Sequence, residues 1–267
     1  MRKTGTVLAM LALAVFVVVA ASRCQIADKL KARDRLNKGV VAYSAKRYPE
    51  ALKYFEEARQ LDPSLVSADV YLATTYRTMY IPGATSKENL ERAQKAIDTF
   101  QEVLKKDPKN ITALASLART YTDLEQHEKA KEWYRKRLEA DPSNPEPLYG
   151  IGSTDFNLVY AKTGVQGEGV KSMSPAERAE AARLVDEGID ALKKALQMKP
   201  DYADAAQFLN LMYREKAKLS TDPAEKEQWN KEADKLALSA MQMKKKQQEE
   251  EEKARKAMGK VTVTKKS

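Results

Sequence analysis

Apolar residues recur along this chain in a short phrase that is written four times. The phrase reads ALKYFEEARQLDP at 51–63, AIDTFQEVLKKDP at 96–108, AKEWYRKRLEADP at 130–142 and, more loosely, GIDALKKALQMKP at 188–200. In each copy a small residue is followed four positions later by a large residue, and a further residue of the pattern follows three positions after that. These spacings place the three side chains on one face of an α-helix. Proline then ends the helix, because it lacks the backbone N–H that another turn needs. The four sets are Ala51, Phe55, Ala58 and Pro63; Ala96, Phe100, Val103 and Pro108; Ala130, Tyr134, Arg137 and Pro142; and Gly188, Leu192, Ala195 and Pro200.

A second helical pattern precedes each phrase. In the third copy it comprises Leu114, Leu117, Ala118, Tyr121 and Leu124, which again share one helix face. Each repeat is therefore predicted to be a pair of antiparallel helices. We expect the helices of a pair to cross closely at the small residue of the first helix, namely Gly39, Ala73, Ala118 and Gly152.

The spacing of the stop prolines indicates a basic period with two additions. The prolines are 45, 34 and 58 residues apart, which is a period of 34 with 11 and 24 residues added. Both additions fall between the two helices of a repeat, at 79–92 and 161–178. In the first, Thr85 and Glu88 fit a capping box.

The second addition contains three glycines and is predicted to be a connector. Its GVQGEGVKS stretch lacks both the Gly-Lys-Ser order and the preceding strand of a phosphate loop. Ser174, Pro175 and Glu177 then predict the start of a new helix, as N-cap, first-turn proline and capping-box glutamate. Because long loops are often functional, residues 161–175 are a candidate accessory contact.

This pattern of residues resembles the tetratricopeptide repeat family. The third repeat, ITALASLARTYTDLEQHEKAKEWYRKRLEADP, matches the family pattern without insertion and departs from it at Arg137, where alanine is preferred. The first repeat has Ala42 where a tyrosine is expected. A fifth repeat is expected over 203–219 and 231–241; Asn210 replaces its small residue and no proline follows. A divergent last repeat is typical, because its outer face is solvated.

The resemblance implies an all-α fold, a right-handed α-solenoid of helix-turn-helix units with four clear repeats, a fifth divergent one and two long insertions within repeats. The expected organisation is a signal peptide or membrane anchor at 1–24, a solenoid at 25–243 and a charged tail at 244–267. The repeats are expected at about 32–65, 66–110, 111–144, 145–202 and 203–243.

The resemblance also implies a binding groove, since members of the family bind extended peptides or partner helices on the concave face lined by the first helices. The aromatic and arginine side chains there suggest an acidic or carboxylate-bearing partner. The alternative, that these are only exposed residues of helices, stays open. The lysine and asparagine clamp that some members use for a C-terminal carboxylate is not reproduced. The expected groove residues are Tyr43, Thr74, Arg77, Arg119, Thr122, Tyr149, Ser153, Phe156 and Arg214.

The net charge of +9 lies at the two ends of the chain. Residues 1–35 and residues 244–267 each carry +5, so the middle carries −1. A protein that binds nucleic acid through its folded body concentrates positive charge there. We therefore expect no nucleic-acid partner.

The N-terminal segment favours a membrane-associated or exported protein. Arg2 and Lys3 precede an uncharged run from Thr4 to Ser22, which fits a secretory signal and is also long enough to span a bilayer. Lipidation of Cys24 is a third outcome, although Arg23 occupies a place where the bacterial lipoprotein motif wants a small residue. We expect the bacterial envelope or periplasmic side. The basic flank after the segment supports the alternative, an anchor facing the cytoplasm.

Few residues could carry chemistry. The chain has one cysteine and one histidine, His127, and it contains no nucleophile elbow, zinc spacing or nucleotide motif. We expect no catalytic residues, no metal and no cofactors. The leading hypothesis is a non-catalytic adaptor that binds a protein or peptide in its groove. The alternative is a structural assembly subunit that oligomerises or rests on anionic lipid through its basic ends; an enzyme of polymer metabolism with a hidden site comes last.

Overall fold

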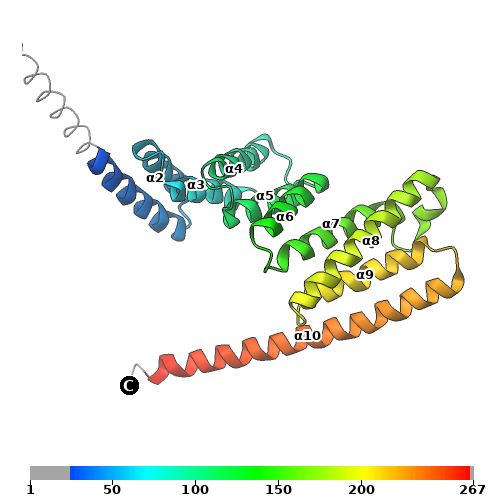
Figure 1. Ribbon diagram of the computed structural model, residues 1–267. Coiled ribbons are helices and arrows are strands. Elements are labelled where there is room, and N and C mark those ends of the chain that lie inside the picture. Colours follow the sequence, from blue (N-terminus) through cyan, green and yellow to red (C-terminus); the bar gives the residue numbers. More distant parts are fainter. Residues whose placement is uncertain (1–24, 265–267) are drawn as a thin grey trace, which may run out of the picture. The chain divides into compact units, whose positions relative to one another are not determined.

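The computed structural model describes residues 25–264, and the regular secondary structure of that range is helical (Figure 1). Its contacts divide the chain into two compact parts, with the division between Leu124 and Glu125. We call residues 25–124 the N-terminal half and residues 125–264 the C-terminal half. The expected signal or anchor, with Cys24, lies outside the described residues. Within them, every helix is too short or too polar to cross a bilayer.

The N-terminal half consists of helices that follow one another as packed neighbours. α3 packs against both α2 and α4, and α5 packs against α4 and α3 (Figure 1). The contact between α3 and α5 joins the first helices of successive repeats. The helices are residues 25–44, α2 (Tyr48–Leu61), α3 (Val66–Met79), α4 (Lys87–Lys106) and α5 (Ile111–Asp123).

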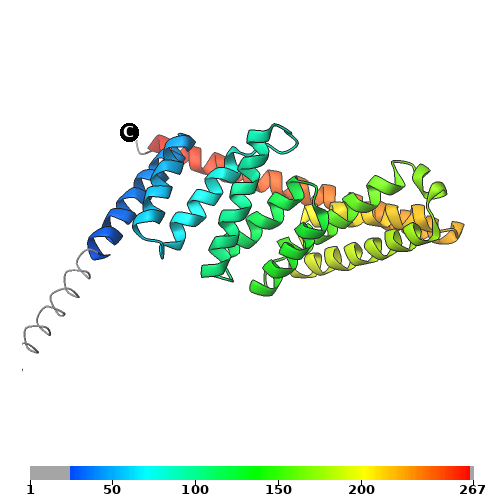
Figure 2. The same cartoon turned by 90° about the horizontal axis from the view of Figure 1, so that it is seen from above.

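The C-terminal half repeats this arrangement with longer helices. α7 packs against α6 and α8, and α9 packs against α7, α8 and α10 (Figure 2). The predicted all-α succession of helix pairs is thus confirmed. The elements are α6 (His127–Ala140), α7 (Glu146–Thr163), the 3₁₀ helix η1 (Glu168–Ser172), α8 (Pro175–Met198), α9 (Ala203–Leu219) and α10 (Pro223–Thr264).

Small residues and large residues interlock where the helices of a pair cross. Phe55 is fully buried, and a Cβ atom placed on Gly39 would lie 2.4 Å from the ring of Phe55. The fourth repeat has the same arrangement, because a Cβ atom placed on Gly152 would lie 2.4 Å from the Leu192 side chain. Ala73 and Ala118 are fully buried at the equivalent positions. The predicted close crossings are confirmed.

The prolines end the helices through the residue that precedes them. α2, α4, α6 and α8 each stop two residues before a proline, and the residue between has φ from −138° to −135° and ψ from 85° to 90°. This extended conformation is the one that the ring of a following proline forces. In two repeats the intervening aspartate also accepts a backbone N–H two residues on, Asp62 from Ser64 and Asp141 from Ser143. The same turn geometry therefore follows each helix, with aspartate before the proline in three repeats and Lys199 in the fourth.

The added residues mostly lengthen helices. α7 and α8 have 18 and 24 residues, against 13 in α5 and 14 in α6. The capping box predicted at Ser174 and Glu177 is confirmed.

The capping box predicted at Thr85 is wrong, because Ser86 is the N-cap. Its hydroxyl accepts the N–H of Asn89 at 3.3 Å. The buried Asn89 side chain then bonds to both the N–H and the carbonyl of Ile81 and closes the preceding loop. With Ser86 as N-cap, α4 begins one residue later than it would with Thr85 as N-cap.

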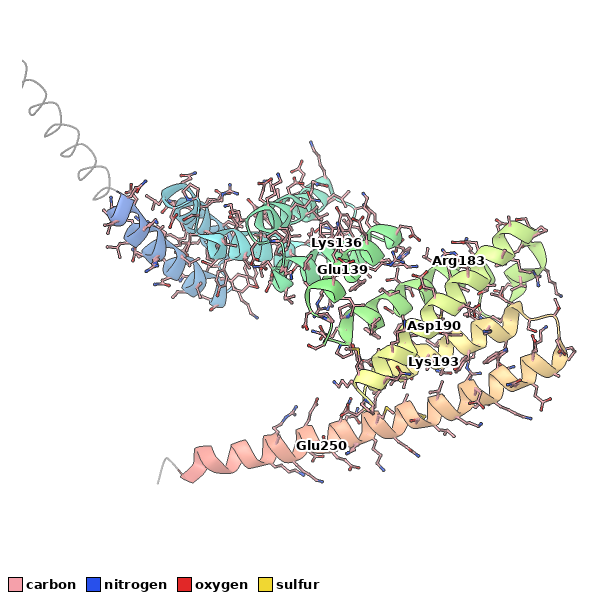
Figure 3. All side chains as sticks on the ribbon, viewed as in Figure 1. Lys136, Glu139, Arg183, Asp190, Lys193 and Glu250 are labelled. Carbon is pink, nitrogen blue, oxygen red and sulfur yellow. The ribbon has the colours of Figure 1, made fainter. Side chains whose placement is uncertain are left out.

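The expected charged tail continues α10. Figure 3 shows Glu250 on a stretch of α10 that runs beyond the turn between α8 and α9, and residues 248–256 are exposed. Glu252 pairs with Lys256 at 2.6 Å, one turn away, as the sequence spacing predicted. Helix propensity and such pairs support this stretch, since no neighbouring helix of the C-terminal half covers it.

A buried ion cluster ties α6 to α7 and α8. The Lys131 ammonium, 1% exposed, lies 2.5 Å from the Asp155 carboxylate, which is fully buried, and 3.0 Å from Glu187. Burial raises the pKa of Asp155 to about 6, although the hydrogen bond from Lys131 opposes the rise. One Asp155 oxygen has no hydrogen-bond partner in the structure. The cluster therefore links the three helices, and the burial of the Asp155 carboxylate costs part of the free energy that the ion pairs contribute.

The first prediction concerns the crossing at Gly39. We expect Gly39→Ala to lower the free energy of unfolding by about 1–3 kcal/mol, because the new methyl group meets the Phe55 ring. Urea denaturation followed by circular dichroism measures the change. Phe55→Leu should do less damage in the Gly39→Ala background than alone, since it makes room for the methyl group. Equal losses in the two backgrounds would contradict this packing.

The second prediction concerns the ion cluster. Lys131→Met leaves Asp155 buried without its cation and should lower the free energy of unfolding by about 3–5 kcal/mol at neutral pH. The double variant Lys131→Met with Asp155→Leu should recover most of this loss, because neither charge is then buried.

The pH dependence follows from the raised pKa of Asp155. The folded carboxyl holds its proton more tightly than its usual value of 3.8 allows, so its stabilising contribution is full below that value and is lost as the pH rises through about 6. In Lys131→Met the folded pKa rises further, so the variant should lose more stability than the wild type between about pH 5 and about pH 7. Parallel stability profiles for the two proteins would show that Asp155 does not depend on Lys131.

Candidate functional site

Three of the five predicted groove residues of the N-terminal half make hydrogen bonds within the chain through their hydroxyl groups. The Tyr43 hydroxyl lies 3.0 Å from the Thr78 hydroxyl. Thr74 donates to the carbonyl of Val70, and Thr122 to the carbonyl of Ala118. These side chains lie on the first helices of their repeats, as predicted, and are partly exposed.

The two predicted groove arginines of this half both interact electrostatically with one carboxylate of the same chain. The Arg77 guanidinium is 3.4 Å from Asp123, the last residue of α5. Burial raises the pKa of Asp123, and the charges of Arg77 and Arg119 oppose the rise. Arg77, which was predicted to face an acidic ligand, is therefore paired with a carboxylate of the protein itself, whereas Arg119 is exposed.

The C-terminal half brings two predicted residues into a continuous row of aromatic rings. Tyr149 and Phe156 both lie on α7, and Phe208 of α9 packs edge-on against each, with ring centroids 5.5 and 5.6 Å apart. Tyr202 continues the row beyond Tyr149 at 5.3 Å. Tyr160 continues it beyond Phe156, also at 5.3 Å. We call these five residues the aromatic strip.

The strip exists because the first helices of the fourth and fifth repeats lie side by side. Its rings are partly exposed, and Tyr160 is the most open, with 38% of its surface accessible. Burial and the neighbouring Tyr149 raise the pKa of Tyr202, so this ring stays uncharged at neutral pH. A row of rigid, half-exposed rings is the kind of surface where binding energy concentrates at interfaces.

Sequence reasoning missed three members of the strip. Tyr160 follows Phe156 by four residues, which is one helical turn, and this spacing could have found it. Tyr202 and Phe208 belong to the fifth repeat, whose weak signature hid their register. Their closeness to Tyr149 depends on how α9 packs on α7 and is not visible in the spacing.

The remaining predicted residues have other local roles. Ser153 donates to the carbonyl of Gly150 within α7. Arg214 bonds to Asn210 at 3.1 Å and to Asp234 of α10 at 2.8 Å. Arg137, the departure from the repeat pattern, is buried and pairs with Glu146 at the start of α7. The chain thus uses arginine there to join two repeats.

Nothing in residues 25–256 groups three or more His, Cys, Asp or Glu side chains as a metal ion requires. His127 lies at the start of α6 and is partly exposed. The described side chains of the C-terminal half instead offer a partly exposed row of aromatic rings.

Comparison with known proteins identifies the repeats. Models of the tetratricopeptide repeat match residues 32–65 and residues 90–149. The chain is 29% identical over 118 residues to "Tetratricopeptide repeat protein 8" of Mus musculus, a match that covers 44% of this chain and 21% of that protein. The first curated relatives are matched over 16% to 21% of their length.

Solved structures show the same fold. "MamA 41-end from Desulfovibrio magneticus RS-1" is 18% identical, with a TM-score of 0.58 over 81% of this chain and 97% of that one. YrrB, described as "a TPR protein with an unusual peptide-binding site", is 17% identical, with a TM-score of 0.52 over 79% and 90%. The predicted resemblance is confirmed in that the chain contains tetratricopeptide repeats and has the fold of their solenoids.

The third prediction concerns the centre of the aromatic strip. Phe208→Leu removes two edge-on ring contacts and should lower the free energy of unfolding by about 1–2 kcal/mol. Tyr160→Leu, at the open end of the strip, has one ring contact and should lose less. Urea denaturation of both variants measures the difference; an equal or smaller loss for Phe208→Leu would show that the rings are not packed as described.

Proposed function

We propose that this protein is a non-catalytic scaffold that binds a partner protein or peptide on the first helices of its repeats, with the aromatic strip as the main contact. The strip is the observation that carries the proposal. Its rings are held in place by one another, so little side-chain freedom is lost when a partner covers them. They are also open enough to be covered.

The fold supports the same function. Tetratricopeptide repeats stack helix pairs into a surface suited to extended partners. YrrB, which has this fold, is described as having a peptide-binding site. In the scaffold we propose, the contact surface is the aromatic strip, whose rings come from α7 and the start of α9.

We propose further that residues 1–24 direct the protein to a membrane or across it, on the bacterial envelope side. The support is the sequence alone: a basic start, a long uncharged run and small residues before Cys24. The mass of the native N-terminus, measured on protein isolated from membrane and soluble fractions, distinguishes a cleaved, a retained and a lipidated chain. A retained segment with residues 25–267 protected from external protease would reverse the orientation proposed here.

The fourth prediction tests the binding surface. Tagged full-length chains carry either Phe156→Ala with Tyr160→Ala, or Asp190→Ala with Lys193→Ala as the matched control. Figure 3 shows the two control residues on α8, a second helix, and both are exposed. We expect the amount of protein that co-purifies with the strip variant to be about tenfold lower than with the wild type, because aromatic residues contribute much of the binding energy at interfaces. The control should retain them. Quantitative mass spectrometry measures the loss.

Two further chains make the outcome decisive. Charge reversal of Arg77 and Arg119 tests whether the N-terminal half contributes, and deletion of residues 244–267 tests the basic end. The scaffold is contradicted if the strip variant, folded as judged by urea denaturation, keeps every partner. Loss of partners on deletion of 244–267 alone would favour the structural assembly subunit instead.

A further inference from the structure

The C-terminal half contains a basic pocket at the end where α7 turns into α8 and α9 turns into α10. Both connections lie at the same end of this half in the two views (Figures 1 and 2). The pocket has a volume of about 770 Å³, and its walls come from the residues around η1, the end of α9 and the start of α10. Its basic residues are Lys171, Arg178, Arg214, Lys218 and Lys226.

The walls of this basic pocket are pinned by hydrogen bonds between the two connections. Lys218 of α9 donates to the carbonyl of Gly164 at 2.7 Å. Arg178 of α8 donates to the carbonyls of Val170 and Leu219, at 3.0 and 3.4 Å. The pocket is therefore formed before any ligand arrives, which lowers the entropy lost on binding.

The charge of the basic pocket is not balanced from within. No aspartate or glutamate is among its lining residues. Arg214 and Lys218 do have carboxylate partners, Asp234 and Glu215. Arg178 instead bonds to neutral carbonyls and keeps its charge.

Lys171 and Lys226 are exposed and form no ion pair with any described side chain. An anion entering here therefore meets two uncommitted ammonium groups and an uncompensated guanidinium. Such a concentration of one charge sign attracts ligands of the opposite sign.

The aromatic strip leads into the basic pocket. The Lys218 ammonium lies over the Tyr160 ring, 5.2 Å from its centroid, and Lys218 is also a wall of the pocket. A partner that covers the open end of the strip thus reaches the pocket within a few residues of extended chain. The two features form one continuous surface of rings followed by cations.

We propose that the basic pocket binds the carboxylate side chains of an acidic partner peptide whose apolar residues lie on the aromatic strip. The proposal rests on the proposed function and names the chemistry of its partner. One extended peptide satisfies both features, since its apolar residues cover the rings and its carboxylates reach Lys171 and Lys226 beyond Tyr160. The separate ammonium groups can each pair with a separate carboxylate along that peptide.

The test uses the full-length chain and a fluorescent synthetic peptide with phenylalanines in one half and consecutive glutamates in the other. The pocket variant is Lys171→Gln with Lys226→Gln. The control is Lys194→Gln with Lys245→Gln, which removes the same charge from exposed lysines of this half outside the pocket. We expect the pocket variant to bind the peptide about tenfold more weakly and the control to bind like the wild type. A peptide with glutamines in place of the glutamates should lose as much with the wild type.

Each other outcome overturns the proposal. Equal weakening in the pocket variant and the control would indicate general charge attraction. Unchanged binding by the pocket variant would remove the pocket from the site. Inorganic tripolyphosphate that binds the pocket while the acidic peptide does not would make it a phosphate site.

Failure here is distinguishable from failure of the proposed function. If the strip variant loses the native partners and the pocket variant keeps them, the scaffold stands and the basic pocket is not part of it. If the strip variant keeps its partners, the proposed function itself fails, whatever the synthetic peptide does.

Discussion

The close crossing of two helices at a small residue is the constraint on which the rest of this structure depends. Phe55 can lie fully buried only because Gly39 presents bare backbone to its ring, and Leu192 depends on Gly152 in the same way. A helix pair brought this close buries its apolar face with few large residues. This explains how a chain with 32% charged residues and 7% aromatic residues still buries an apolar core in each half. Most aromatic side chains of the C-terminal half are therefore only partly buried and pack on the edge of the core.

Polar groups then decide how neighbouring helices are aligned. Lys131 and Asp155 bring a buried charge pair between α6 and α7, and Arg137 joins α6 to Glu146 at the start of α7. Hydrophobic packing alone tolerates small shifts of one helix along another, whereas a desolvated ion pair loses its balance when displaced. Burial raises the pKa of Asp155 even though Lys131 opposes the rise, so desolvation of this carboxylate is the larger of the two effects. These contacts set the register of the repeat that carries the aromatic strip.

The long fourth repeat makes the surface that we propose as functional. Its added residues extend α7 beyond the usual length, which places Tyr160 past Phe156 and carries the strip toward the end of the repeat. The rest of the addition forms the connection around η1, whose carbonyls bind Lys218 and Arg178. One lengthening of a repeat thus supplies both the open ring and the wall of the basic pocket.

The sequence by itself determined the helix pairs, their ends and their crossings. Each of these can be read from short-range patterns. Proline acts on the residue before it, Ser174 and Glu177 cap α8, and small and large residues at helical spacing mark the faces that cross. The same local logic failed at Thr85, where Asn89 closes a loop from eight residues away and moves the helix start to Ser86. The tertiary structure alone decided which groove candidates meet. Tyr149 and Phe156 of α7 contact Phe208 of α9, although the whole of α8 separates them along the chain. Arg77 pairs with Asp123, 46 residues further along the chain. Contacts between helices far apart in the chain depend on the rotation of each helix about its axis, and that rotation is set by packing that no short pattern records.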